Sequence, residues 1–382
     1  MRTMQSGGEA VPRGPLFVKI GSSSLAEPGA GLSTAKLEGL VLEVMAARAL
    51  VGDVVLVSSG AVAAGLGPLG LRPGAVTRSE RQAAAAVGQA RLMEAYRTLC
   101  GQQGVEAAQV LICRSELENP RRVAHLRRAV AELLRRGALP IVNENDTAAA
   151  DELRFGDNDT LAALLAVALD ARLLVLLTDI DGLYDADPRH RPQARRIAEV
   201  RAWTPDVMAL GGRAGTGVGS GGMRTKLRAA RIASDAGIDT VVTRAQVGQL
   251  AAVLRGESVG TRFRASPSPG SRSRVLLRYG ARPRGRLILD DGAVAAVERR
   301  GASLLAAGVL ELRGAFEPGD VVELATAGER VIGRGTALLG ARDLARVMAR
   351  RQAGQAPGGV RVVHHRAMVL AGEERDDGRI QA

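Results

Sequence analysis

Residues 157–182 read DNDTLAALLAVALDARLLVLLTDIDG and join a helical pattern directly to a strand pattern. The first part, 158–169, is rich in Ala and Leu and is long enough to form a helix. The second part, 172–178, is a nearly continuous apolar run that leads into the acidic stretch 179–182. A strand that is apolar on both faces is typical of a parallel sheet covered by helices on both sides.

The same alternation extends in both directions from this segment, over residues 16–243. It predicts an α/β fold in which a mostly parallel sheet is sandwiched by helices. Sheets of this kind bind their ligands at the carboxyl ends of the strands. The expected strands are 16–20, 54–57, 107–112, 138–142, 172–178 and 239–243, and the expected helices lie near 34–50, 79–100, 119–136, 158–169 and 222–236.

The character of the chain changes after the Pro/Ser/Gly-rich stretch ASPSPGSRS (265–273), which we interpret as a linker. Short β-type runs such as RVLLR (274–278) and RLILD (286–290) then alternate with Gly-centred turns. This pattern predicts a small β-rich barrel of roughly 100 residues. The predicted organisation is a disordered tail at 1–15, an α/β domain at 16–262, a linker at 263–273, a β-rich domain at 274–372 and a second tail at 373–382.

Composition places the 382-residue chain among ordinary two-domain globular proteins, with 46% hydrophobic and 24% charged residues. Its two cysteines, Cys100 and Cys113, are too few for a disulfide framework or a thiolate zinc site. Residues 1–15 lack the apolar segment of a signal peptide, and the longest apolar stretch, 161–169, is too short to span a bilayer. We therefore expect a cytoplasmic protein.

Positive charge is concentrated towards the end of the chain. The formal net charge is +12, and residues 261–382 hold 21 Arg against 13 Asp and Glu. This excess is explained either by a general bias towards Arg or by an anionic partner, such as RNA, for the C-terminal third. The aromatic content of 2% argues against a surface on which bases stack.

Three Gly/Ser clusters lie in the α/β domain: GSSS (21–24), SSGAVAAG (58–65) and GTGVGSGGMRTK (215–226). Glycine-rich turns expose backbone N–H groups, and a helix that follows adds its positive end, so together they bind phosphate or carboxylate. The stretch 219–226 lacks the spacing of a Walker A loop, and no GxGxxG unit directly follows the first expected strand, so a dinucleotide-binding unit is disfavoured.

Lysine is rare in this chain, which contains only three lysines and 49 arginines. Two of them, Lys19 and Lys226, adjoin glycine clusters, whereas Lys36 lies on an expected amphipathic helix. Lysine is a compact charge on a flexible stem that can follow a moving phosphoryl group, while arginine is a rigid fork. The placement of Lys19 and Lys226 therefore indicates a chemical requirement for lysine.

Acidic and amide side chains cluster in NENDTAAADELRFGDND (143–159) and in TDIDG (178–182). At strand ends they suit a Mg²⁺–nucleotide, a substrate ammonium group, or the positioning of catalytic lysines. Helix capping by Asp157 or Asn158 explains only part of the cluster. The combined interpretation is phosphoryl transfer, with lysines and backbone N–H groups binding the phosphoryl group.

These motifs together resemble the glutamate 5-kinase family, which has the amino-acid kinase fold. The ordered set includes VKIGSSSL, VLVSSGAVAAG, LPIVNENDT, FGDND and GSGGMRTK, and it covers roughly residues 16–260. The C-terminal third resembles the PUA domain of many bacterial members, with ERRGASLLAAGV and GAFEPGDVVEL as its most recognisable pieces.

The resemblance implies ATP-dependent phosphorylation of the L-glutamate γ-carboxylate with Mg²⁺, as the first step of proline biosynthesis. It also implies feedback inhibition by proline and a homo-oligomer, either a dimer or a tetramer. It implies a catalytic set of Lys19, Lys226 and Asp159, a substrate set of Ser59, Asp146 and Asn158, and a nucleotide set of Lys19, Thr178, Asp179, Ser220, Gly221, Gly222, Met223, Arg224, Thr225 and Lys226.

The chain departs from the family pattern at four positions outside these motifs: Cys113, Pro120, His125 and Asp185. Two other functions stay open at this point. One is a sibling kinase of the same fold that acts on another carboxylate, a carbamate or a nucleotide. The other is an RNA-binding protein with an inert kinase domain, against which the retention of Lys19 and Lys226 argues.

Overall fold

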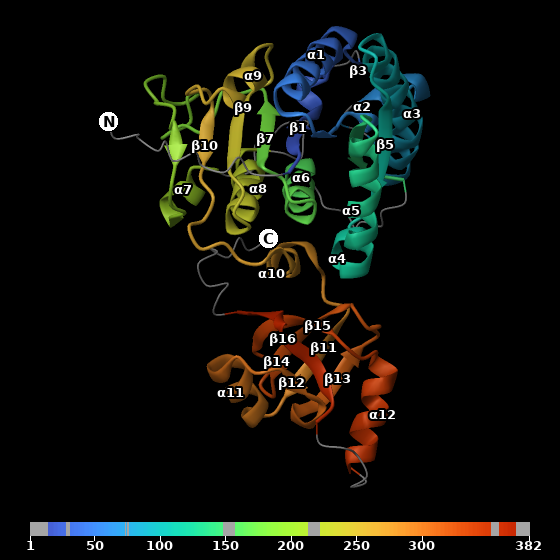
Figure 1. Ribbon diagram of the computed structural model, residues 1–382, viewed down its shortest axis with the longest axis vertical. Coiled ribbons are helices and arrows are strands. Elements are labelled where there is room, and N and C mark those ends of the chain that lie inside the picture. Colours follow the sequence, from blue (N-terminus) through green and yellow to red (C-terminus); the bar gives the residue numbers. More distant parts are fainter. Residues whose placement is uncertain are drawn as a thin grey trace, which may run out of the picture.

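The computed structural model describes residues 14–27, 31–72, 74, 76–147, 157–212, 222–352 and 359–371. They form two bodies, a larger α/β body and a smaller β-rich body below it in Figure 1. Within these residues, no helix combines the length and the apolar character needed to cross a bilayer.

The α/β body is organised by an eight-stranded sheet in the order β5-β6-β4-β1-β7-β9-β10-β8. Every pairing along it is parallel except that of β9 with β10. The predicted mostly parallel α/β class is therefore confirmed. The strands are β1 (Leu16–Ile20), β4 (Val54–Val57), β5 (Ala107–Ile112), β6 (Leu139–Glu144), β7 (Leu173–Thr178), β8 (Glu199–Val200), β9 (Thr240–Arg244) and β10 (Thr261–Phe263).

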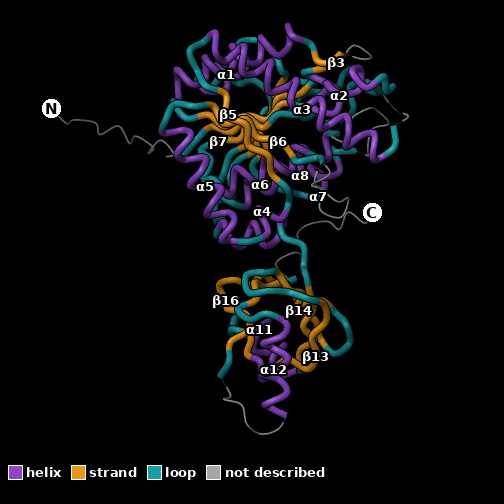
Figure 2. The backbone as a smooth tube through the Cα atoms, turned by 90° about the vertical axis from the view of Figure 1, so that its right-hand side faces the viewer, coloured by secondary structure: helices purple, strands orange, loops and turns teal. Residues whose placement is uncertain are grey.

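Helices cover both faces of this sheet, as the edge-on view in Figure 2 shows. Successive side chains of β1 point to opposite faces of the sheet. Leu16 and Val18 pack on one face with α1, α3 and α9, whereas Phe17 packs on the other face with α5, α6 and α8. The helices of this body are α1 (Thr34–Val51), α2 (Ala61–Leu66), α3 (Arg78–Gln102), α4 (Ser115–Glu118), α5 (Pro120–Arg135), α6 (Asn158–Ala168), α7 (Pro205–Ala209), α8 (Met223–Asp235) and α9 (Gln249–Leu254), and the short elements are η1 (Ser22–Ser24), β2 (Ala26–Glu27), β3 (Gly31–Leu32) and η2 (Gly67–Leu69).

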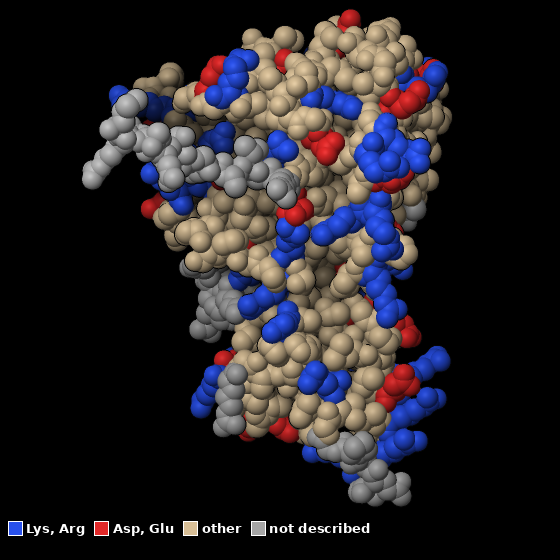
Figure 3. Space-filling view, in the orientation of Figure 1, with Lys and Arg blue, Asp and Glu red and all other residues tan. Residues whose placement is uncertain are grey.

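The smaller body is a six-stranded sheet in the order β12-β16-β15-β14-β11-β13, with its own apolar core. Two helices, α11 and α12, accompany these strands, and the sequence interpretation did not predict either helix. Lys and Arg side chains gather over the end of the molecule where α12 lies (Figure 3). The elements are β11 (Gly285–Leu289), α11 (Asp291–Arg300), β12 (Leu304–Leu305), η5 (Ala306–Gly308), β13 (Val309–Gly314), β14 (Val321–Thr326), β15 (Val331–Ala337), α12 (Ala341–Gln352) and β16 (Arg361–Leu370).

The run RVLLR (274–278), expected as a strand, is helical, so that prediction was wrong. It forms α10 (Arg272–Val275) and a π-helical turn, η4 (Leu276–Gly280), where the chain passes from one body to the other. Its apolar side chains are buried, and Gly280 lies against Leu164 of α6. A short apolar run cannot by itself distinguish a strand from a buried helical turn, and here tertiary packing selects the helix.

Helices α2 and α3 cross with almost no space between their backbones. A Cβ placed on Gly88 of α3 would lie 1.7 Å from the carbonyl oxygen of Ala61, and one on Gly65 of α2 would lie 1.8 Å from that of Ala84. Glycine is needed at both positions because any side chain would collide with backbone. This contact fixes α2, which follows the turn containing Ser59, against α3.

Gly88→Ala is therefore expected to lower the free energy of unfolding by about 2–3 kcal/mol, because the added methyl group forces α2 and α3 apart. The matched control is Gly101→Ala on the same helix, where a Cβ would meet nothing within 4 Å. That change is expected to leave stability equal or slightly higher. Urea unfolding followed by the fluorescence of the single tryptophan, Trp203, measures both; equal effects of the two substitutions would contradict this packing account.

Candidate active site

Asp159 lies at the centre of the site and bridges the two lysines that the sequence singled out. Its Oδ1 lies 2.6 Å from Nζ of Lys19, and its Oδ2 lies 3.3 Å from Nζ of Lys226. The hydroxyl of Thr225 donates to Oδ2 at 2.7 Å. All three charged side chains are nearly excluded from solvent. One carboxylate therefore holds two ammonium groups side by side in a buried environment.

Three different elements bring these groups together. Lys19 is the penultimate residue of β1, the strand between β4 and β7 in the sheet. Asp159 is in the first turn of α6, and Lys226 is in the first turn of α8, which packs beside α6. The polar loops that follow β4 and β7 therefore flank Lys19 at the carboxyl edge, where open α/β sheets bind ligands.

Electrostatics keep Asp159 ionised. Burial alone would raise the pKa of this carboxyl group, but the ammonium groups of Lys19 and Lys226 and the hydrogen bond from Thr225 outweigh it, and the pKa lies well below its usual range. The cluster carries two positive charges and one negative charge, so it retains a net positive charge. A buried net positive charge favours an anionic ligand.

Backbone groups near the lysines add hydrogen-bond donors that suit an anion. Helix α8 begins at Met223, and its N-cap residue, Gly222, places no side chain over the first N–H groups. The turn after β1 runs close to the lysine, since a Cβ on Gly21 would lie 3.7 Å from Nζ of Lys19. Uncapped N–H groups at a helix N-terminus, next to ammonium groups, are suited to phosphate. Met223 and Arg224 also belong to the first turn of α8, whereas the predicted residues Ser220 and Gly221 lie outside the described part of the chain.

Asn158, next to Asp159 in the chain, connects to the turn after β4. Its Nδ2 donates to the hydroxyl of Ser59 at 2.8 Å and to the carbonyl of Ser58 at 3.0 Å. It also lies 3.2 Å from Oδ1 of Asn143, at the end of β6. The cap of α6 is supplied by Asp157, whose carboxylate accepts from the N–H of Thr160 at 2.6 Å. Because Asp157 caps the helix, the side chain of Asn158 instead contacts polar groups at the ends of β4 and β6.

Asp146 lies on the same side of the site as Asn158, in the loop after β6. It lines a small cavity whose other walls come from α2, α3 and the end of β5, with Ala61, Gln89 and Leu111 among them. The backbone of this loop is tied down, because the N–H of Asn145 donates to the carbonyl of Ile112 at 2.9 Å. The three predicted substrate residues, Ser59, Asp146 and Asn158, therefore lie around the ends of β4 and β6, beside the lysines.

Thr178 and Asp179 lie on the other side of Lys19, at the end of β7. The hydroxyl of Thr178 donates to Oδ1 of Asp179 at 2.9 Å, and its carbonyl accepts from the N–H of Ala245 at 2.7 Å. Thr178 is buried and Asp179 is exposed. The order across the edge is thus the residues predicted for the substrate, the lysine cluster and then the residues predicted for the nucleotide.

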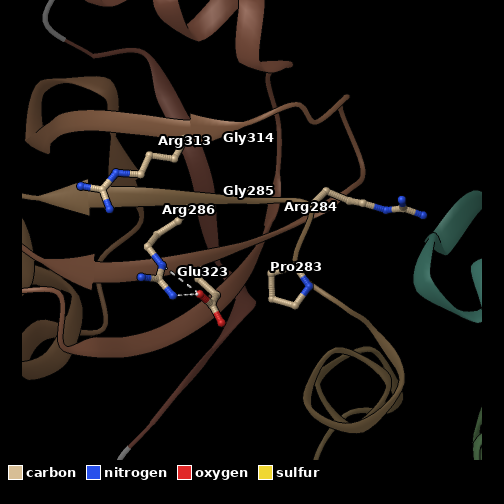
Figure 4. A pocket seen from close by; sticks show the side chains of 7 residues that line it. All are labelled: Pro283, Arg284, Gly285, Arg286, Arg313, Gly314 and Glu323. Atoms are coloured by element: carbon tan, nitrogen blue, oxygen red, sulfur yellow. Dashed lines mark hydrogen bonds and ion pairs between the residues drawn. The ribbon is translucent and has the colours of Figure 1, made fainter. Parts of the chain in front are cut away.

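A larger pocket, of about 390 Å³, lies far along the chain from these residues, in the smaller body (Figure 4). Its arginines are already paired with carboxylates: Arg286 lies 2.7 Å from Glu323, and Arg313 lies 2.6 Å from Glu329. Arg284 points towards the α/β body in Figure 4 and lies 3.6 Å from Glu118 of α4. These pairs neutralise the pocket, so it lacks the unbalanced positive charge of the lysine cluster.

The sequence interpretation missed four residues that connect to Asn158 by hydrogen bonds. Asn143 and the carbonyl of Ser58 accept from Asn158 directly, Gln89 contacts Asn143, and Tyr96 contacts the hydroxyl of Ser58. Asn143 carried a signal, because it opens the NEND motif after a strand. Gln89 and Tyr96 fall within an expected helix, and nothing in their spacing marks them as polar contacts of a distant strand end.

Comparisons with known proteins identify this arrangement. A family model described as "Amino acid kinase family" matches residues 15–244, and one for the PUA domain matches residues 285–355. A glutamate 5-kinase from Gloeobacter violaceus is 46% identical over 88% of this chain and 92% of its own length. The chain belongs to the amino acid kinase family, and within it to the glutamate 5-kinases. A second member, from Synechococcus sp. (strain JA-3-3Ab), is 42% identical over 90% of this chain and 93% of its own length.

Two solved structures of other kinases are similar at lower identity. Carbamate kinase from Giardia lamblia, bound to AMP-PNP, has a TM-score of 0.49 and 17% identity, and the match covers 66% of this chain and 99% of that protein. UMP kinase from Bacillus anthracis has a TM-score of 0.46 and 17% identity, covering 66% and 96%.

Proposed function

We propose that this member of the glutamate 5-kinases transfers the γ-phosphoryl group of ATP to the γ-carboxylate of L-glutamate. The product is γ-glutamyl 5-phosphate, and the reaction is the first step of proline biosynthesis. The observation that carries the proposal is the bridge from Lys19 through Asp159 to Lys226 at the carboxyl edge of the central strands. The glutamate 5-kinases, at 42–46% identity along most of the chain, support glutamate as the acceptor.

The catalytic roles follow from charge. In the reaction an oxygen of the substrate carboxylate forms a bond to the γ-phosphorus, and the bond from that phosphorus to the bridging oxygen breaks as ADP leaves. Lys19 and Lys226 neutralise charge on the phosphoryl group during this transfer. Asp159 holds the two ammonium groups in place. No general base is required, because a carboxylate is already ionised near pH 7.

The binding roles divide between the two sides of the lysine cluster. Ser59, Asp146 and Asn158 bind glutamate around the ends of β4 and β6. Thr178, Asp179 and the segment 220–226 bind ATP, with the N-terminus of α8 directed at its phosphates. With glutamate and ATP approaching the lysines from two sides, the attacking carboxylate oxygen and the leaving bridging oxygen of ATP would lie on opposite sides of the γ-phosphorus, as an in-line transfer requires.

Mg²⁺ is expected to enter with ATP. The described residues contain no group of three or more His, Cys, Asp or Glu side chains arranged to hold a metal. Mg²⁺ often keeps several waters and is held mainly by substrate phosphates with one or two carboxylates, and this mode suits the residues present. The ion would neutralise charge on the β- and γ-phosphates, next to Asp179 and the lysines.

A substrate panel tests the proposed acceptor. ADP release is measured with Mg-ATP and, in turn, L-glutamate, L-aspartate, carbamate and UMP. We expect a turnover with glutamate that exceeds all others by at least about tenfold. A preference for one of the other acceptors would instead identify a sibling kinase, and ATP binding without turnover on any of them would indicate an inert kinase domain.

Partners beyond the substrate belong to the same proposal. Proline acts as feedback inhibitor, the enzyme is a dimer or tetramer, and it works in the cytoplasm. The C-terminal domain, with its excess of arginine, is a candidate to bind RNA. Filter binding at rising salt tests this point: affinity that falls steeply with salt supports it, and an absence of binding at low salt would remove it.

A further inference from the structure

Helix α3 directs two polar side chains at the substrate side of the site. Gln89 and Tyr96 are seven residues apart, two helical turns, and so lie on one face. The side-chain Nδ2 of Asn143 donates to Oε1 of Gln89 at 2.9 Å, and the hydroxyl of Tyr96 lies 2.8 Å from that of Ser58. Asn143 is the penultimate residue of β6 and Ser58 follows β4, and both contact Asn158.

The backbone determines which way the two asparagine amides face. The N–H of Glu144 is only a donor, and it meets the Asn143 side chain at 2.9 Å, so that atom is Oδ1. Nδ2 of Asn143 must then face Gln89. The carbonyl of Ser58 is only an acceptor, so the Asn158 atom beside it is Nδ2. Oδ1 of Asn158 is therefore turned away from these protein groups, and we expect it to accept from a donor of the ligand.

The hydroxyl of Ser58 is oriented by Tyr96 in the same way. The single hydroxyl proton of Ser58 is directed to the carbonyl of Ser59 at 3.1 Å, so Tyr96 is the donor in the bond between the two hydroxyls. Tyr96 is fully buried, and burial raises the pKa of its hydroxyl far above its usual range despite the bond to Ser58. It keeps its proton, and thus its role as donor, at any working pH.

We propose that Gln89 and Tyr96 are positioning residues for glutamate, acting through Asn143, Ser58 and Asn158. Gln89 holds the Asn143 side chain, whose Oδ1 accepts from the Asn158 amide. Tyr96 holds the Ser58 hydroxyl, which donates to the carbonyl of Ser59, and so fixes the turn that supplies the other two acceptors of this amide. Without Gln89 the Asn143 side chain can turn, and without Tyr96 the turn after β4 loosens, so that in either case the amide can present Nδ2 where the ligand needs Oδ1. This inference rests on the proposed function, because it assumes that Asn158 and Ser59 bind the acceptor substrate.

The test is a comparison of Tyr96→Phe and Gln89→Met with wild type, since both changes keep size and remove only the polar contact. We expect each to raise the KM for glutamate about five- to tenfold, as the loss of one hydrogen bond implies. The KM for ATP and the kcat are expected to stay within about threefold, because neither residue reaches the lysine cluster. Tyr279→Phe is the matched control: it loses a hydroxyl bond to Asp235, 2.6 Å long, far from the substrate residues.

The outcomes separate the two proposals. Unchanged KM values for glutamate in both variants, with active wild type, would overturn the positioning role even if the melting temperature fell. A rise in the KM for ATP equal to that for glutamate would also overturn it, because this pattern indicates general loosening. If folded wild type binds ATP and makes no product from glutamate, the proposed function fails, and the positioning role for glutamate fails with it.

Discussion

Lys226→Arg is expected to fold as wild type and to lose about 10²–10³-fold in kcat, as removal of one group that stabilises the transition state does. The guanidinium keeps the charge and can still pair with Asp159. It is, however, a rigid planar fork that cannot follow the phosphoryl group as a compact ammonium does. Lys226 is also buried, so there is little room for a different approach.

The matched control is Lys36→Arg. Lys36 is exposed on α1 and donates to the carbonyl of Ala26 at 2.9 Å, away from the lysine cluster. Its substitution should leave kcat and both KM values as in wild type. Steady-state kinetics gives kcat and both KM values for the two variants and the wild type, and melting temperatures show whether each variant is folded. A Lys226→Arg enzyme with turnover within a few-fold of wild type would refute the requirement for lysine.

Asp159→Asn is expected to lower the free energy of unfolding by about 3–5 kcal/mol and to abolish measurable turnover. The change leaves two buried ammonium groups without a counter-charge, which is costly because neither can be solvated. Asp343→Asn, at an exposed position on α12 with a pair to Arg346, is the control and should cost less than about 1 kcal/mol.

The pH dependence of stability gives Asp159→Asn a second readout. The folded state holds the pKa of Asp159 below its unfolded value, so its stabilisation is present above about pH 4 and is lost as the pH falls further. The difference in free energy of unfolding between wild type and Asp159→Asn should thus be constant from pH 5 to pH 8 and should become smaller below about pH 4. Urea unfolding across this range measures it, and a difference that grows below pH 4 would contradict the account.

Much of the α/β body could be predicted because its signals are local. Continuous apolar strands and Ala/Leu-rich helices have distinct periods, and the segment 157–182 contains both. Lys19 and Lys226 were prominent because the chain so rarely uses lysine. Their common partner, Asp159, lies in an acidic cluster, and the sequence alone left open whether such acids bind Mg²⁺, bind an ammonium group or hold the lysines.

What could not be predicted depends on contacts distant in sequence. The run 274–278 is apolar enough for a strand, and only its packing against α6 makes it helical. Tyr96 looks like any core residue of an amphipathic helix, and its bond to Ser58 spans 38 positions. Gly88 likewise looks like an ordinary helical glycine in the sequence. Only the packing of α2 shows that a Cβ at this position would lie 1.7 Å from the carbonyl oxygen of Ala61.

The most direct test of the central claim is to trap the product. Purified protein is incubated with Mg-ATP, L-glutamate and hydroxylamine, which converts an acyl phosphate to its hydroxamate. We expect a hydroxamate that requires both ATP and glutamate, is identified as the γ-glutamyl species by mass spectrometry, and falls to background in Asp159→Asn. Folded wild-type protein that binds ATP yet yields no glutamate-dependent hydroxamate would contradict acyl phosphate formation at this site.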